Sequence, residues 1–204
     1  MSCQNVYSTP TKLKQFYNIP DRNADIPIKI GIYESLGQYI YKQDCIDFIN
    51  NYGMKGVPAN FDYVINNNIK FVGNDSSVAK EALKVWNKGE NNAGDEASLD
   101  IQIILGVCEI GLNKGDEIYI YNDDQRTVDG YTHFFQYLNS NTNSDIPRIW
   151  SISYHVDEIS AGVPNSLINT VNNLSKNNYQ IFTSSGDSGS SSCSKNWYKG
   201  DIRP

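Results

Sequence analysis

The segment EIYIYN, residues 117–122, followed by VDGYTHFFQYLN, residues 128–139, shows the pattern from which the fold class follows. The first segment is a short run of β-branched and aromatic residues, which favours a strand. The second has apolar residues at helical spacing, which favours a helix. The same alternation recurs along the chain: we expect further strands at 26–34, 69–73, 147–154 and 179–185, and further helices at 38–53, 92–112 and 160–178.

Strands that alternate with helices of this length predict right-handed βαβ units. We therefore expect one α/β domain across residues 1–204, with a parallel sheet covered by helices on both faces. In such sheets the reactive groups gather beyond the carboxyl ends of the strands. Residues that directly follow a predicted strand are therefore the first candidates for a functional site.

Composition and charge exclude several classes of protein. Of the 204 residues, 39% are hydrophobic, which is too many for a disordered chain. The net charge is −6, without a long block of like charges, so we expect no nucleic-acid partner. No apolar run approaches the roughly 18 residues of a membrane span. Residues 1–15 lack the apolar centre of a secretory signal, which leaves the location of the protein open.

Metal binding is poorly supported by the sequence. The four cysteines form no C-x-x-C pair, and the spacing alone assigns no disulfide; they are Cys3, Cys45, Cys108 and Cys193. No set of acidic and histidine residues converges by its spacing on either of the two histidines, His133 and His155. We therefore expect no metal site and a structural role for each histidine.

The loop FTSSGDSGSSSC, residues 182–193, follows the last predicted strand and contains G-D-S-G. A trypsin-like nucleophile at Ser188 is excluded, because that class of protease is all-β and pairs its serine with a histidine base. Asp187 is the stronger candidate, since flanking glycines let the backbone approach a ligand. Two alternatives stay open: Asp187 caps a neighbouring amide in a solvated turn, or residues 186–192 bind an anion.

A second acidic site lies in GDEASLDIQIILGV, residues 94–107, where Glu96 and Asp100 are four residues apart on one helical face. One interpretation is an ordinary helix start, with Asp95 as N-cap and acidic residues favoured by the helix dipole. It explains Asp100 poorly, since this residue lies more than one turn into the helix. A coupled carboxylate pair can hold a shared proton and act as an acid or a base.

Three motifs in this order resemble those of the sedolisin family of serine-carboxyl peptidases: EASLD at 96–100, SISYHVDE at 151–158 and SSGDSG at 184–189. The stretch YSTPTKLKQFYNIP, residues 7–20, is similar to the start of the catalytic domain in that family, so the resemblance covers almost the whole chain. The resemblance implies a subtilisin-like parallel α/β fold and a peptidase, either an endopeptidase or a tripeptidyl-peptidase.

The resemblance also implies roles for individual residues. Glu96 would be the general base, and Asp100 the second carboxylate that orients it. Asp187 would be the protonated acid that donates a hydrogen bond to the oxyanion. The residues expected to contact a peptide or protein substrate are Ser153, Tyr154, His155 and Gly186.

Two departures from the family pattern affect the expected activity. The nucleophile motif G-T-S-x-S is absent from these 204 residues, and His155 stands where the family has glycine. We therefore expect a sheet truncated before its final strands, and no turnover by this chain alone unless a separate chain supplies the serine segment. The family calcium site and the partner of Cys193 would lie in that same absent part. The alternative is a non-catalytic protein that binds a peptide or another partner.

Overall fold

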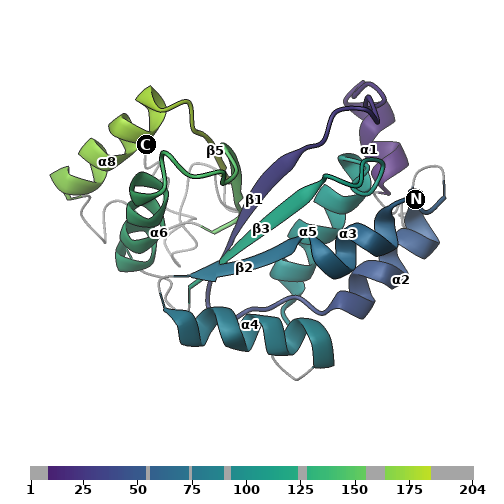
Figure 1. Ribbon diagram of the computed structural model, residues 1–204, viewed down its shortest axis with the longest axis horizontal. Helices are drawn as coiled ribbons and strands as arrows, with labels where there is room; N and C mark the ends of the chain where they lie inside the picture. Colours follow the sequence, from purple (N-terminus) through teal and green to yellow (C-terminus); the bar gives the residue numbers. More distant parts are fainter. Residues whose placement is uncertain are drawn as a thin grey trace, which may run out of the picture.

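The computed structural model describes residues 9–53, 56–73, 75–89, 93–123, 128–154 and 164–184. Its centre is a parallel sheet of five strands in the order β2-β3-β1-β4-β5 (Figure 1). The strands are β1 (Lys29–Glu34), β2 (Ile69–Gly73), β3 (Glu117–Asn122), β4 (Ile149–Ile152) and β5 (Gln180–Thr183). The predicted α/β fold with a parallel sheet is confirmed, and the arrangement is consistent with a subtilisin-like fold.

The two faces of the sheet carry different side chains. Ile32 pairs with Ile120 in neighbouring strands, and both are completely buried on one face. Tyr33 pairs with Tyr121, and their stacked rings are buried on the other face. Because side chains alternate along a strand, a continuous apolar run serves two cores at once. This explains why the strand segments show no polar alternation in the sequence.

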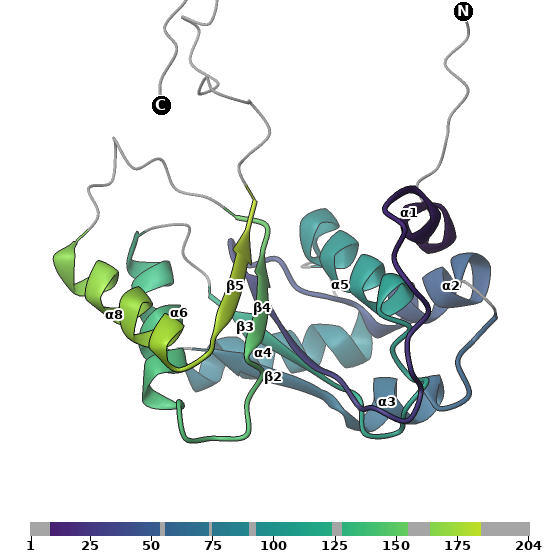
Figure 2. The same cartoon turned by 90° about the horizontal axis from the view of Figure 1, so that it is seen from above.

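Helices cover both faces, as Figure 2 shows most clearly. The helices are α1 (Pro10–Phe16), α2 (Lys42–Tyr52), α3 (Phe61–Asn67), α4 (Ser76–Lys88), α5 (Asp95–Val107), α6 (Val128–Ser140) and α8 (Asn165–Lys176). The isoleucine face packs against α2, α3 and α5, and the tyrosine face against α6 and α8. Helix α4 packs on β2 through Ala82, Val85 and Trp86. In the part of the chain that the structure describes, no helix is long and apolar enough to cross a membrane.

The structure differs from the sequence expectation in its helices. Two helices, α2 and α3, connect β1 to β2, and two more, α4 and α5, connect β2 to β3, whereas the sequence analysis expected one in each connection. Helix α1 was also missed. The expected helix 92–112 is shorter, because Glu109 and Gly111 adopt positive φ angles of 50° and 93° and so end the helical path.

At the amino edge of the sheet, a buried ion pair attaches the N-terminal segment. Asp116 is completely buried and accepts two hydrogen bonds from Arg22, at 2.8 and 2.5 Å. It also accepts hydrogen bonds from the backbone N–H groups of Ile28, Gly111 and Asn113. Burial alone would raise the pKa of Asp116, but these donors outweigh it and hold the pKa below its ordinary value.

Candidate active site

Strand β1 ends at the carboxyl edge of the sheet in a buried acid and a tight turn. Glu34 is the last residue of β1 and is completely buried. The next four residues form a turn in which the N–H of Gln38 donates to the carbonyl of Ser35 at 3.1 Å. Both central residues, Leu36 and Gly37, have positive φ angles, 63° and 64°. The turn reverses the chain at once and brings Gln38 back toward the sheet edge.

Helix α5 carries the two acids that the sequence analysis selected. Its buried stripe consists of Ala97, Ile101 and Leu105, all completely buried. Glu96 and Asp100 each lie one position before a residue of that stripe, so both are half-buried at the edge of the core. The helix therefore presents this pair of carboxyl groups at the boundary between protein interior and solvent.

Two residues that follow β4 contact acids from different elements. The Ser153 hydroxyl donates to Asp100 Oδ1 at 2.7 Å, and the Tyr154 hydroxyl donates to Glu34 Oε2 at 3.0 Å. Since β4 is hydrogen-bonded to β1, the carboxyl ends of these strands are neighbours. This strand pairing is what joins residues more than fifty positions apart into one site.

The surroundings of the Glu34 carboxyl favour its protonated form. Burial raises its pKa well above the ordinary value, and the negative charge of Asp100 raises it further. The hydrogen bond from Tyr154 opposes this rise, and the charge of Glu96 adds to it. Glu34 Oε1 is buried and has no hydrogen-bond partner among the described residues. A buried carboxyl with so few donors favours the neutral form.

The pKa of Asp100 is also raised, but this side chain is more accessible to solvent than that of Glu34. Burial raises its pKa, the Ser153 hydroxyl opposes this, and the charge of Glu96 adds to it, giving a pKa of about 6. Its second oxygen, Oδ2, is buried and accepts no hydrogen bond from any residue that the structure describes. A carboxyl that titrates near pH 6 exchanges protons readily in mildly acidic solution, which suits a general acid or base.

The structure therefore brings together four of the predicted site residues: Glu96, Asp100, Ser153 and Tyr154. The other three, Asp187, His155 and Gly186, lie outside the described residues. A contribution of Ser153 and Tyr154 to substrate binding stays a prediction, but both hydroxyl groups also hold acids of the site.

Sequence reasoning missed Glu34. The signal was available, since IPIKIGIYE ends in an acid at the carboxyl end of a predicted strand, where reactive groups gather. It also assigned the cap of α5 to Asp95, whereas the N-cap is Gly94 and the capping oxygen comes from Gln38. That contact joins residues 58 positions apart, so no local pattern in the sequence indicates it.

A separate pocket of about 180 Å³ lies near the other end of α5 and includes none of these acids. It is mainly apolar and is lined by Ile49, Gly53, Gly56, Val57, Pro58, Ala59, Leu105, Gly106, Glu109 and Leu112. Within the described ranges, no group of three or more histidine, cysteine or acidic residues could hold a metal ion. The described groups at the carboxyl edge include the carboxyl groups of Glu34, Glu96 and Asp100 and the hydroxyl groups of Ser153 and Tyr154.

No family model matches this sequence. The chain is 26% identical, over 206 aligned residues, to the tripeptidyl-peptidase sed4 of Aspergillus fumigatus. The chain is a distant relative of a tripeptidyl-peptidase. The alignment covers 96% of this chain and 32% of that protein, so the chain spans about a third of the length of its relative. The similarity supports the resemblance to peptidases that the motifs indicated.

Proposed function

We propose that this chain contributes the acidic part of a serine-carboxyl peptidase site, which hydrolyses peptide bonds in acid. The observation that carries the proposal is the cluster of Asp100, Glu96 and Glu34, in which burial raises the pKa of Asp100 to about 6. Carboxyl groups with raised pKa values at the carboxyl edge of a parallel sheet are typical of functional sites. The distant similarity to a tripeptidyl-peptidase supports the same class of reaction.

In this proposal each acid has a distinct task. Glu96 accepts the proton of a serine nucleophile, and Asp100 orients Glu96 and shares that proton. Glu34 stays protonated beneath them, so that it adds no further negative charge to the pair. Asp187, in its neutral form, donates a hydrogen bond to the oxyanion of the tetrahedral intermediate. The serine itself is supplied by a segment outside the 204 residues, since they contain no G-T-S-x-S.

The test uses the native protein with every polypeptide that copurifies with it. A fluorophosphonate probe labels an activated serine, and mass spectrometry of the labelled peptide identifies the chain that carries it. We expect hydrolysis of fluorogenic peptides in acid, labelling of a serine outside this sequence, and a loss of kcat of about 100-fold or more in Asp100→Asn. Unchanged kcat in Asp100→Asn, with the probe still bound, would overturn the assignment.

A second candidate function is peptide binding without hydrolysis. The observation that favours it is again the absence of G-T-S-x-S from the sequence. Without a nucleophile, no covalent acyl transfer proceeds, however well the acids are placed. Calorimetric titration with unlabelled peptides separates the two functions: binding with intact peptide recovered afterwards supports the second, and recovery of cleaved peptide supports the first.

A further inference from the structure

Helix α5 begins without a capping side chain of its own. Its N-cap residue is Gly94, which has no side chain to satisfy the first free N–H groups of the helix. Instead, Oε1 of Gln38 accepts hydrogen bonds from the backbone N–H groups of Glu96 at 3.1 Å and Ala97 at 3.4 Å. These are the second and third helical positions, where an N-cap side chain normally accepts. The cap is thus supplied by a residue 58 positions away.

The glycine at position 94 is explained by the same side chain. The φ angle of Gly94 is −108°, a value open to every residue, so backbone freedom is not the reason for glycine. A Cβ atom built at this position would lie 2.3 Å from Gln38 Oε1 and 2.5 Å from Gln38 Cβ. The Gln38 side chain therefore occupies the place that a local cap would need.

The turn that carries Gln38 also carries the buried acid of the site. Glu34 directly precedes the turn, and Gln38 is its last residue. The next residue, Tyr39, accepts a hydrogen bond from the N–H of Gly94 at 2.9 Å. One short segment thus fixes Glu34 and, through two separate contacts, the first turn of the helix that carries Glu96 and Asp100.

We infer that Gln38 is a positioning residue for the acid pair: its side-chain carbonyl fixes the first turn of α5 and so sets where Glu96 and Asp100 lie relative to Glu34. Gln38 is assigned no contact with substrate and no proton. The catalytic meaning of this role rests on the proposed function, but the positioning itself is a property of the chain without substrate.

The charged and polar groups that face Asp100 come from three elements. Glu96 lies on the same helix, Glu34 lies at the end of β1, and Ser153 and Tyr154 follow β4. If the first turn of α5 loosens, Glu96 moves away and water reaches Asp100. Both changes lower the pKa of Asp100 toward its ordinary value, because like charge and burial are what raised it.

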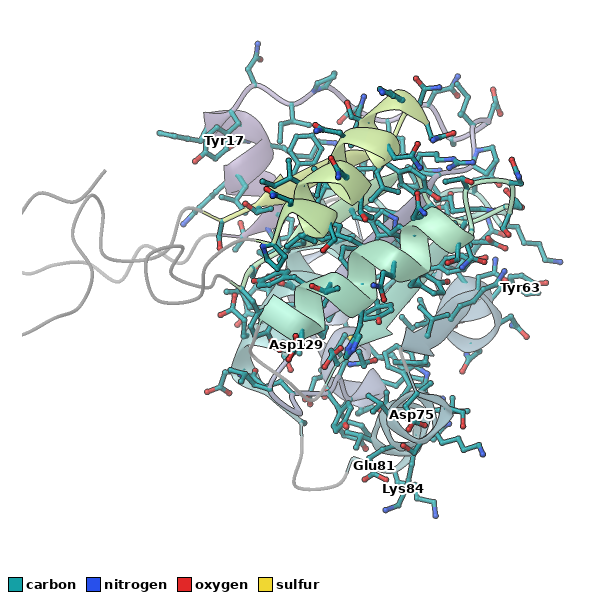
Figure 3. All side chains as sticks on the ribbon, turned by 90° about the vertical axis from the view of Figure 1, so that its left-hand side faces the viewer. Tyr17, Tyr63, Asp75, Glu81, Lys84 and Asp129 are labelled. Carbon is teal, nitrogen blue, oxygen red and sulfur yellow. The ribbon has the colours of Figure 1, made fainter. Side chains whose placement is uncertain are left out.

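The experiment measures amide hydrogen exchange and carboxyl titration by NMR in the intact chain. In Gln38→Ala we expect exchange at the N–H groups of Glu96 and Ala97 to accelerate by about tenfold or more, since a cap is lost. The pKa of Asp100 should fall from about 6 toward 3.8. The matched control is Asp75→Ala, which removes the local cap of α4 that accepts from the N–H of Ser77 (Figure 3 labels Asp75). It should leave the pKa of Asp100 unchanged.

Two further variants separate positioning from a general loss of stability. Gln38→Glu keeps an acceptor oxygen, so it should restore amide protection, and its negative charge should keep the pKa of Asp100 at or above 6. Gly94→Ala inserts a Cβ into the place of the Gln38 side chain and should lower the pKa of Asp100 as Gln38→Ala does. An unchanged pKa of Asp100 in both Gln38→Ala and Gly94→Ala overturns the inference.

The readouts distinguish failure of this inference from failure of the proposed function. Neither exchange nor titration needs substrate, so a protein that hydrolyses no peptide still gives a result. If Gln38→Ala lowers the pKa of Asp100 and no peptidase activity is found, Gln38 positions acids that serve another purpose. If activity is found and the pKa of Asp100 does not move in Gln38→Ala, the peptidase proposal stands and the role of Gln38 falls.

Discussion

Asp116, which directly precedes β3, and Glu34, the last residue of the adjacent strand β1, are both completely buried carboxyl groups, yet their surroundings are opposite. Asp116 lies at the amino edge and accepts two hydrogen bonds from Arg22 and three from backbone N–H groups. Glu34 lies at the carboxyl edge, where the Tyr154 hydroxyl donates to one of its oxygens and the other has no donor in the described structure. Burial raises the pKa of Glu34, whereas the donors around Asp116 more than cancel the same effect.

Asp116 therefore has the environment of a structural acid, and Glu34 that of an acid available for proton exchange. A carboxylate with a full set of donors and a paired arginine stays ionised and holds its surroundings together. A buried carboxyl with one donor and a second acid nearby has a raised pKa, so it takes up a proton and becomes neutral while it stays buried. Burial alone does not determine whether a carboxyl is ionised or neutral. The number and the charge of its hydrogen-bond donors do.

The largest expected effect is the loss of stability in Asp116→Asn. This change leaves the Arg22 guanidinium largely buried without a negative partner, so we expect the free energy of unfolding at pH 7 to fall by about 3–5 kcal/mol. The same change of acid to amide in Glu34→Gln should alter it by less than about 1 kcal/mol, because burial raises the pKa of Glu34 and so favours the neutral carboxyl, which the amide resembles. Urea unfolding of both variants tests the comparison. Equal losses would show that donor number does not distinguish the two acids.

The next effect is a dependence of stability on pH that arises from Asp100. The folded protein binds a proton at this site with a pKa of about 6, above the ordinary value of 3.8. The free energy of unfolding should therefore fall by about 2–3 kcal/mol as the pH rises from about 4 to about 7. Asp100→Asn should remove this part of the dependence. Asp116 has a lowered pKa and contributes with the opposite sign, losing stability as the pH falls through its folded pKa.

The smallest effect sharpens the description of Glu34 itself. Tyr154→Phe removes the hydroxyl that donates to Glu34 Oε2, at a cost of about 1 kcal/mol in the free energy of unfolding. Because that hydrogen bond lowers the pKa of Glu34, its loss should raise the pKa further. Titration of the ¹³C-labelled carboxyl by NMR measures the shift. Tyr179→Phe, which removes a hydroxyl that donates to the carbonyl of Leu138, is the control and should leave Glu34 unchanged.

The strands were predictable because their signal is local. The expected bounds 69–73 and 117–122 agree with β2 and β3, in which β-branched and aromatic residues predominate. Helix α4 was missed even though Asp75 caps its start and Gly89, with a φ angle of 64°, ends it. It was missed because only one helix was expected between β2 and β3. Helix α3 was missed in the same way: since β3 lies between β1 and β2, the crossover from β1 to β2 passes over a strand, and this longer connection holds two helices.

The site was predictable only in part, for a related reason. Glu96 and Asp100 lie on one helix, so their spacing reveals a shared face. The partners of these acids come from other elements: Ser153 lies 53 residues from Asp100, and Tyr154 lies 120 residues from Glu34. Such contacts follow from the strand order, which no local pattern contains. The motif resemblance selected Glu96 and Asp100, whereas only the fold reveals that a third acid, Glu34, lies near the pair.

The glycine that opens α5 has a consequence for how this sequence can diverge. The side chains at positions 38 and 94 would occupy the same space. We therefore expect the two residues to be substituted together, and most single substitutions at either position to be unfavourable. A relative with serine or aspartate at position 94 would cap its own helix and would need a small residue at position 38. A relative with glutamine at position 38 must keep glycine at 94. Covariation of these two positions would therefore record the contact between the turn that follows β1 and helix α5.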